Sequence, residues 1–114
     1  MSTSVNNTRA QSLLRLLNFR TPGDWQIVTP PPELMWPTAL TACLRVGTHI
    51  IYAARSDGRR NARWYVRARS GDAMFLWGRI VNSGDSVPIA VGQAAAQIGR
   101  HDPTITPLVW QVAR

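Results

Sequence analysis

The alternation of apolar and polar residues between positions 48 and 81 is the feature that most constrains the fold. It predicts three β-strands, over residues 48–55, 62–69 and 73–81. The turns between them, at residues 56–58 and 70–72, are short and each contains a glycine, as hairpin turns do. Because so few residues cannot form a crossover, the sequence predicts an antiparallel β-meander.

The segments on either side of the meander predict helices. Thr8 and Gln11 have the spacing of a capping box, and the apolar residues that follow recur at helical spacing through Leu17. Residues 89–98 are rich in alanine and predict a short second helix that ends at Gly99. The expected fold is therefore α+β: an N-terminal helix packed on an antiparallel meander of about 3–5 strands, with a short alanine-rich helix near the C-terminus.

Three further segments are less regular. Residues 25–28 are a candidate for a short strand. Residues 37–46 fit either a helix that begins at Pro37 or a strand with alternating apolar residues, and their alanine and leucine content favours the helix. Residues 104–112 are expected to form a final strand, which Pro107 confines to an edge of the sheet.

The 114 residues are enough for one domain, and a hydrophobic content of 45% is enough for an ordinary core. We expect a flexible tail over residues 1–7 and a single domain over 8–114. The sequence contains neither a signal-peptide pattern nor an apolar run long enough to cross a bilayer, so a cytoplasmic or intravirion location is expected.

Positive charge is concentrated in the middle of the chain. All 13 basic residues are arginine, there are six acidic residues, and the formal net charge is +7. Eight of the arginines but only two of the aspartates lie between residues 45 and 79, so this third of the chain holds nearly all of the excess. A strongly basic surface indicates an acidic partner, and guanidinium groups bind phosphate through paired hydrogen bonds.

The two central predicted strands place this charge beside aromatic rings. In residues 62–69 the alternation puts Trp64 and Val66 on one face and the arginines on the other; in residues 73–81, Met74, Leu76 and Ile80 are expected on the core face. Together with the arginines of the preceding turn, the opposite face is predicted to be a nucleic-acid-binding site formed by Arg59, Arg60, Arg63, Tyr65, Arg67, Arg69, Phe75, Trp77 and Arg79. Arginines would neutralise phosphates and the rings would stack on unpaired bases, as single-strand binding with weak sequence specificity requires.

Two alternatives remain at this stage. A helix that covers the second face would make Phe75 and Trp77 part of the core, and the arginines a solvated surface. The chain could also be a small protein-interaction or assembly module, such as a phage, plasmid or viral accessory or structural protein, that forms homo-oligomers or binds a protein partner. Tryptophan and arginine are enriched at such interfaces, and Trp36 and Trp110 are candidate anchors.

Residues suited to catalysis or to cofactor binding are sparse. Cys43, His49 and His101 are the candidates for a nucleophile and a base, and their context matches no catalytic motif or zinc-binding spacing. The sequence has no glycine-rich phosphate loop, and its carboxylates occur singly. We therefore expect a protein that is not an enzyme and binds no metal or cofactor.

Overall fold

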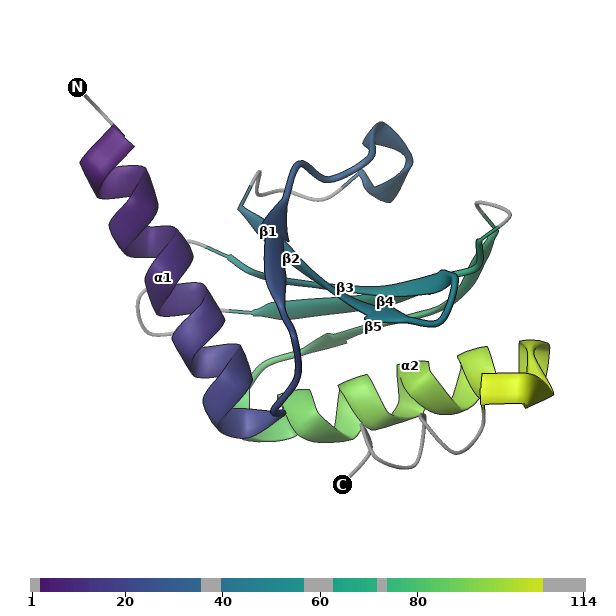
Figure 1. Cartoon of the computed structure of the whole chain (residues 1–114). Coiled ribbons are helices and arrows are strands. Elements are labelled where there is room, and N and C mark those ends of the chain that lie inside the picture. Colours follow the sequence, from purple (N-terminus) through teal and green to yellow (C-terminus); the bar gives the residue numbers. More distant parts are fainter. Residues whose placement is uncertain (1–2, 36–39, 57–62, 72–73, 106–114) are drawn as a thin grey trace.

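Five antiparallel strands form one sheet, and their order in space is their order in the chain (Figure 1). The computed structural model describes residues 3–35, 40–56, 63–71 and 74–105. The strands are β1 (Gln26–Val28), β2 (Thr41–Val46), β3 (His49–Arg55), β4 (Trp64–Arg69) and β5 (Phe75–Val81). The predicted meander is confirmed.

Two helices and three single turns complete the described structure. They are α1 (Thr3–Arg20), α2 (Val87–His101) and the 3-10 turns η1 (Pro32–Leu34), η2 (Gly84–Ser86) and η3 (Pro103–Ile105). The α+β fold with a helix near each end is therefore as predicted. Among the described residues, no helix combines the length and the hydropathy needed to span a bilayer.

The boundaries differ from the predicted ones at both ends of the chain. Helix α1 begins at Thr3, upstream of the capping-box residue Thr8. The final strand predicted over residues 104–112 is not observed where the structure describes it, because Thr104 and Ile105 belong to η3. Residues 106–112 lie outside the described part.

The preference for a helix over residues 37–46 is wrong for the part that the structure describes. Strand β2 pairs with β1 on one side and β3 on the other. Its Ala42 and Leu44 are buried on one face, and Thr41 and Cys43 are buried on the opposite face. A strand covered on both faces reads as a continuous apolar run, which sequence alone does not distinguish from a helix. Residues 37–39 lie outside the described part.

Strands β2 and β3 are joined by a two-residue turn, because Val46 pairs with His49. Gly47, the first residue of that turn, has φ +65°. Two-residue hairpin turns of the kind that matches strand twist need a positive φ at this position, which glycine adopts without steric cost.

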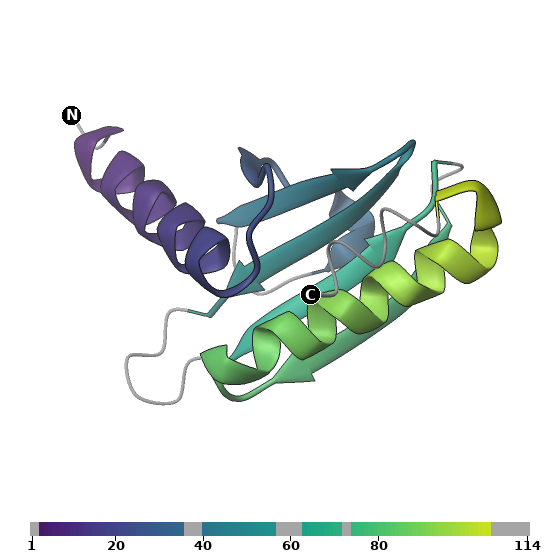
Figure 2. The same cartoon turned by 60° about the horizontal axis from the view of Figure 1, so that its bottom comes forward.

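Helix α2 lies across one face of the sheet, called here the inner face (Figures 1 and 2). Its buried Ala90, Ala94 and Ala95 belong to the same core as Val66 and Ala68 of β4. Small side chains on both elements let the helix approach the strands closely. Leu13 and Leu17 of α1 join this main core, so both helices are packed on the inner side.

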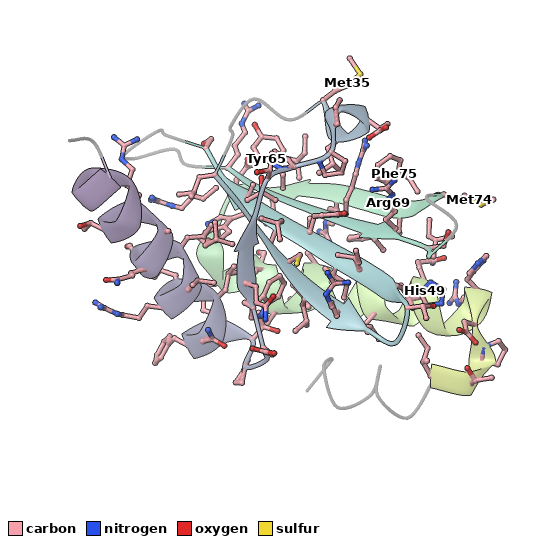
Figure 3. The ribbon with its side chains drawn as sticks, turned by 45° about the horizontal axis from the view of Figure 1, so that its top comes forward. Met35, His49, Tyr65, Arg69, Met74 and Phe75 are labelled. Atoms are coloured by element: carbon pink, nitrogen blue, oxygen red, sulfur yellow. The ribbon has the colours of Figure 1, made fainter. Side chains whose placement is uncertain are left out.

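The opposite face, called here the outer face, is covered by neither α1 nor α2. Its cover among the described residues is the segment around η1, where the buried Leu34 packs on Cys43 and Tyr52 (Figure 3). This second, smaller cluster lies over β2 and β3 and leaves most of β4 and β5 open on the outer side.

A β-bulge interrupts the pairing of β4 with β5. Arg69 pairs with Phe75, but the preceding Ala68 pairs with Trp77, so Leu76 is an extra residue in β5. An inserted residue reverses the alternation beyond it. Phe75 therefore lies on the outer face, whereas Leu76 and Trp77 pack against the main core on the inner face.

Candidate functional site

The outer face carries three rows of side chains that run across the strands, as the registers of the sheet define them. In each row the neighbours belong to successive strands. From β2 to β5 the rows are Arg45–Ile50–Arg69–Phe75, Cys43–Tyr52–Arg67–Gly78 and Thr41–Ala54–Tyr65–Ile80.

The centre of this face is a cluster of two arginines on one aromatic ring. The guanidinium carbon of Arg67 lies 5.1 Å from the centroid of the Phe75 ring, and that of Arg69 lies 5.7 Å from it. Both distances are within the range of a cation–π interaction. Phe75 therefore holds two positive groups side by side, half-buried on the open part of the sheet.

Neighbouring residues fix the two arginine side chains. Arg69 Nη1 lies 3.5 Å from the Tyr52 hydroxyl oxygen, to which it donates a hydrogen bond. The Arg67 side chain lies flat across Gly78, where an added Cβ would be 3.1 Å from both Cγ and Nε of Arg67. Glycine at position 78 therefore lets the Arg67 guanidinium reach the ring on β5.

The positive charge of the cluster is not neutralised by the described carboxylates. Within residues 3–35, 40–56, 63–71 and 74–105, two carboxylates contact a basic side chain: Asp85 forms an ion pair with Arg20, and Asp102 is hydrogen-bonded to His49. Arg45, Arg67 and Arg69 take part in neither. The outer face can therefore offer guanidinium donors to an anion.

An open cleft lies beside the cluster, between η1 and the last two strands. Its volume is about 540 Å³, and its lining consists of Leu34, Met35, Tyr65, Val66, Arg67, Gly78, Arg79 and Ile80. Met35 is 89% exposed at the end of η1, and Figure 3 shows it directed away from the sheet. The cleft thus combines the ring of Tyr65, the guanidinium group of Arg67 and exposed apolar side chains.

The structure brings five of the predicted site residues together. Tyr65, Arg67 and Arg69 follow one another along β4, Phe75 lies beside Arg69, and the exposed Arg63 directly precedes β4 on the same side by alternation. Backbone hydrogen bonding between Arg63 and Ser56 holds this start of the strand. Arg59 and Arg60 lie outside the described residues.

The expectation that Trp77 and Arg79 share this face is wrong. Trp77 packs on the main core under α2, and Arg79 Nη1 donates a hydrogen bond to Gln93 Oε1 of α2 at 2.7 Å. The expected core position of Ile80 is wrong too, because its side chain is 57% exposed on the outer face. All three errors have one physical cause, the bulge at Leu76, which no alternation pattern reveals.

Two residues of this face were not predicted. Tyr52 is on the outer face because it pairs with Arg67, and the alternation within residues 48–55 contained that information. Arg45 is on the same face, next to Ile50, and was lost because its segment was taken for a helix.

Cys43 and His49, two of the candidates for catalysis, are held in environments that disfavour a catalytic role. Burial raises the pKa of the Cys43 thiol, against the opposing effect of Arg45, so the thiolate is disfavoured. His49 Nδ1 accepts a hydrogen bond from the Gly71 backbone N–H at 3.0 Å, which leaves Nε2 as the protonated nitrogen that donates to Asp102 Oδ2 at 2.9 Å. Both ring nitrogens of His49 are thus occupied by neighbouring segments.

The comparisons with known proteins name no relative: no family model matches the chain, and searches of curated proteins and of solved structures give no significant match.

Proposed function

We propose that this protein is a non-catalytic nucleic-acid-binding domain that binds an unpaired strand along β4 on the outer face. The observation that carries the proposal is the cluster of Arg67 and Arg69 on the Phe75 ring, without a carboxylate partner among the described residues. Nucleic acid offers the phosphates that such a cluster would bind, and planar bases for the adjacent Tyr65.

The aromatic side chain between the arginines favours a single strand, because a base must be unpaired to stack on a ring. Alternate residues of an antiparallel strand are about 6.8 Å apart, which is the spacing of positions 65, 67 and 69 along β4. Stacked nucleotides in a duplex rise by about 3.4 Å on each strand. Contacts along β4 are therefore spaced at twice this rise, so the spacing alone fits either every second nucleotide of a stacked strand or successive nucleotides of an unstacked one, and the ring of Tyr65 favours the unstacked strand.

The proposed roles follow from this arrangement. Arg63, Arg67 and Arg69 bind successive phosphates, and Arg45 extends the basic surface towards β2. Tyr65 supplies a stacking surface, while Phe75 acts mainly as the support for two guanidinium groups. Contacts of this kind recognise the backbone and the base planes rather than base edges, so sequence specificity should be weak.

The first test is a titration of a fluorescently labelled oligonucleotide at several salt concentrations, comparing the wild-type protein with the double variant Arg67→Gln/Arg69→Gln. Loss of two phosphate contacts on a single strand should reduce the slope of log K against log salt by about 1.4. The matched control is Arg15→Gln/Arg100→Gln, which removes the same charge from exposed positions on α1 and α2. Equal slopes for the two double variants, or no binding by the wild type at low salt, would refute the proposal.

A protein partner is the second candidate, because exposed apolar side chains surround the cluster. Met35, Met74 and Ile80 are 89%, 57% and 57% exposed. An assembly module that uses this rim would bury these side chains on a partner of its own. If the protein is such a module, the wild type should bind its protein partner and no nucleic acid. The double variant Met35→Ser/Ile80→Ser should then lose the protein partner.

A further inference from the structure

Strand β5 forms one edge of the sheet, and this edge has no partner strand among the described residues. In the described sheet, β5 pairs with β4 alone. Its seven residues include neither proline nor an acidic side chain, and Gly78, Arg79 and Ile80 are exposed. Beyond the bulge at Leu76, residues 77–81 alternate regularly and carry one charged side chain, Arg79, and their outward N–H and C=O groups have no partner strand in the described sheet.

The sequence of β5 is complementary to itself about Gly78. Trp77 precedes this glycine and Arg79 follows it, and both point to the inner face. If two antiparallel copies of β5 pair with Gly78 opposite Gly78, each Trp77 lies directly opposite an Arg79 of the other copy. Each Arg79 then faces a tryptophan ring and not the Arg79 of the other copy. Two cation–π contacts thus replace a contact between like charges.

The surface beside this edge is hollowed between β5 and α2. A groove of about 380 Å³ lies between β5 and α2, and its lining includes Trp77, Arg79, Gln93, Ala96 and Arg100. Figure 2 shows α2 running alongside the last strands at this border of the molecule. Ile89 of the same helix is 60% exposed. The edge therefore continues into a surface with both apolar and polar groups.

We propose that the protein forms a symmetric dimer in which β5 pairs antiparallel with β5 of a second copy, centred on Gly78, to make one continuous ten-stranded sheet. The occupant is a second copy because the strand's own residues supply the matching pairs. The two-fold axis is perpendicular to the sheet, so both outer faces lie on the same side. This inference does not depend on the proposed function.

Cross-linking tests the register directly. In a Cys43→Ala background, Gly78→Cys places two sulfurs at directly opposite positions, where Cα atoms of paired strands are within the roughly 4.4–6.8 Å that a disulfide requires. The new Cβ would lie 3.1 Å from Cγ and Nε of Arg67, so the Arg67 side chain must shift by a few tenths of an ångström. We expect a disulfide-linked dimer on mild oxidation, and a Gly78→Cys protein that stays uncross-linked overturns the proposal.

The control is Ile80→Cys in the same background. In the proposed register, residue 80 of one copy lies opposite residue 76 of the other. The two residues 80 are therefore offset by four residues along the strands, which separates their Cα atoms by about 13 Å, too far for a disulfide. Ile80→Cys should therefore remain uncross-linked under the same conditions. Equal cross-linking of both variants would indicate random collision and would also refute the register.

Light scattering over a range of concentrations gives an independent measurement on the unmodified chain. The wild type should reach twice the 12.7 kDa of one chain, and Arg79→Glu should weaken the dimer about tenfold or more, because it loses two cation–π contacts. Arg15→Glu on α1 makes the same charge change away from the edge and should leave the dimer intact.

Each copy carries a net charge of +7, so added salt should strengthen the dimer while it weakens nucleic-acid binding. A wild type that remains monomeric at hundreds of micromolar overturns the proposal.

Discussion

Phe75 is the residue on which the outer-face cluster depends, since its ring contacts the guanidinium groups of both Arg67 and Arg69. The ring is half-buried, so the two cations are partly shielded from water. Under these conditions a cation–π contact contributes more than at a fully exposed site. The aromatic ring, rather than its hydrophobicity alone, should therefore matter at this position.

Replacing Phe75 with Leu should lower the free energy of unfolding by about 1–2 kcal/mol, because two cation–π contacts are lost while an apolar side chain remains. Phe75→Tyr keeps the ring and should stay close to the wild type. Urea denaturation followed by circular dichroism measures the difference. Equal losses in the two variants would show that the guanidinium contacts contribute nothing to stability.

At the scale of elements, the bulge in β5 decides which side chains reach the outer face. Because Leu76 is the extra residue between the pairs Arg69–Phe75 and Ala68–Trp77, removing it would leave β5 with a regular alternation. Phe75 would still face outward and Trp77 inward. The faces of the strand should therefore survive the deletion.

Deletion of Leu76 should give a folded protein that is destabilised by about 1–2 kcal/mol, through loss of a half-buried leucine. Its tryptophan emission should remain close to that of the wild type. Deletion of Gly78 is the matched control: it shifts the residues beyond it by one position, exchanges their faces and should unfold the domain. If the Leu76 deletion were as damaging as the Gly78 deletion, the bulge would not be a separable insertion.

The elements differ in how far the sequence determines them. Strand β4 was predictable because its residues alternate between the two faces, with Trp64 and Val66 on the inner face. The same alternation placed Tyr65, Arg67 and Arg69 on the outer face correctly, and β3 was predicted from a similar period of two. Strand β2 was not, because Leu34 covers its second face and removes the polar half of the pattern. The positions of Trp77 and Arg79 depend on a register shift, which is a property of two paired strands and not of either sequence segment.

At the scale of the whole molecule, Asp102 connects the end of α2 to the far end of the sheet. Its carboxylate accepts hydrogen bonds from the Thr104 hydroxyl, at 2.6 Å, and from His49. His49 in turn binds the Gly71 backbone N–H of the β4–β5 turn. The Thr104 hydrogen bond and then that of His49 lower the pKa of Asp102 below its usual value.

A lowered pKa in the folded state means that Asp102 contributes stability above the pKa of an unfolded aspartate, about 3.9, and that this contribution is lost as the pH falls through its folded pKa. Thermal unfolding of the wild type should therefore show a loss of stability below about pH 4. Asp102→Asn should flatten that part of the curve and lower stability at neutral pH. The exposed Asp24→Asn makes the same charge change as a control. Parallel curves for the wild type and Asp102→Asn would contradict the role of this carboxylate.

The order of the strands also has a consequence for how the chain reaches its native state. Every pairing in the described sheet joins neighbours along the chain, from β1–β2 to β4–β5. Such local pairing keeps the entropy cost of loop closure small, and domains with short sequence separations between contacts reach their folded state faster than those with distant pairings. The sheet can thus grow hairpin by hairpin as the polypeptide leaves the ribosome, while α2 can cover the inner face only after all five strands have been synthesised.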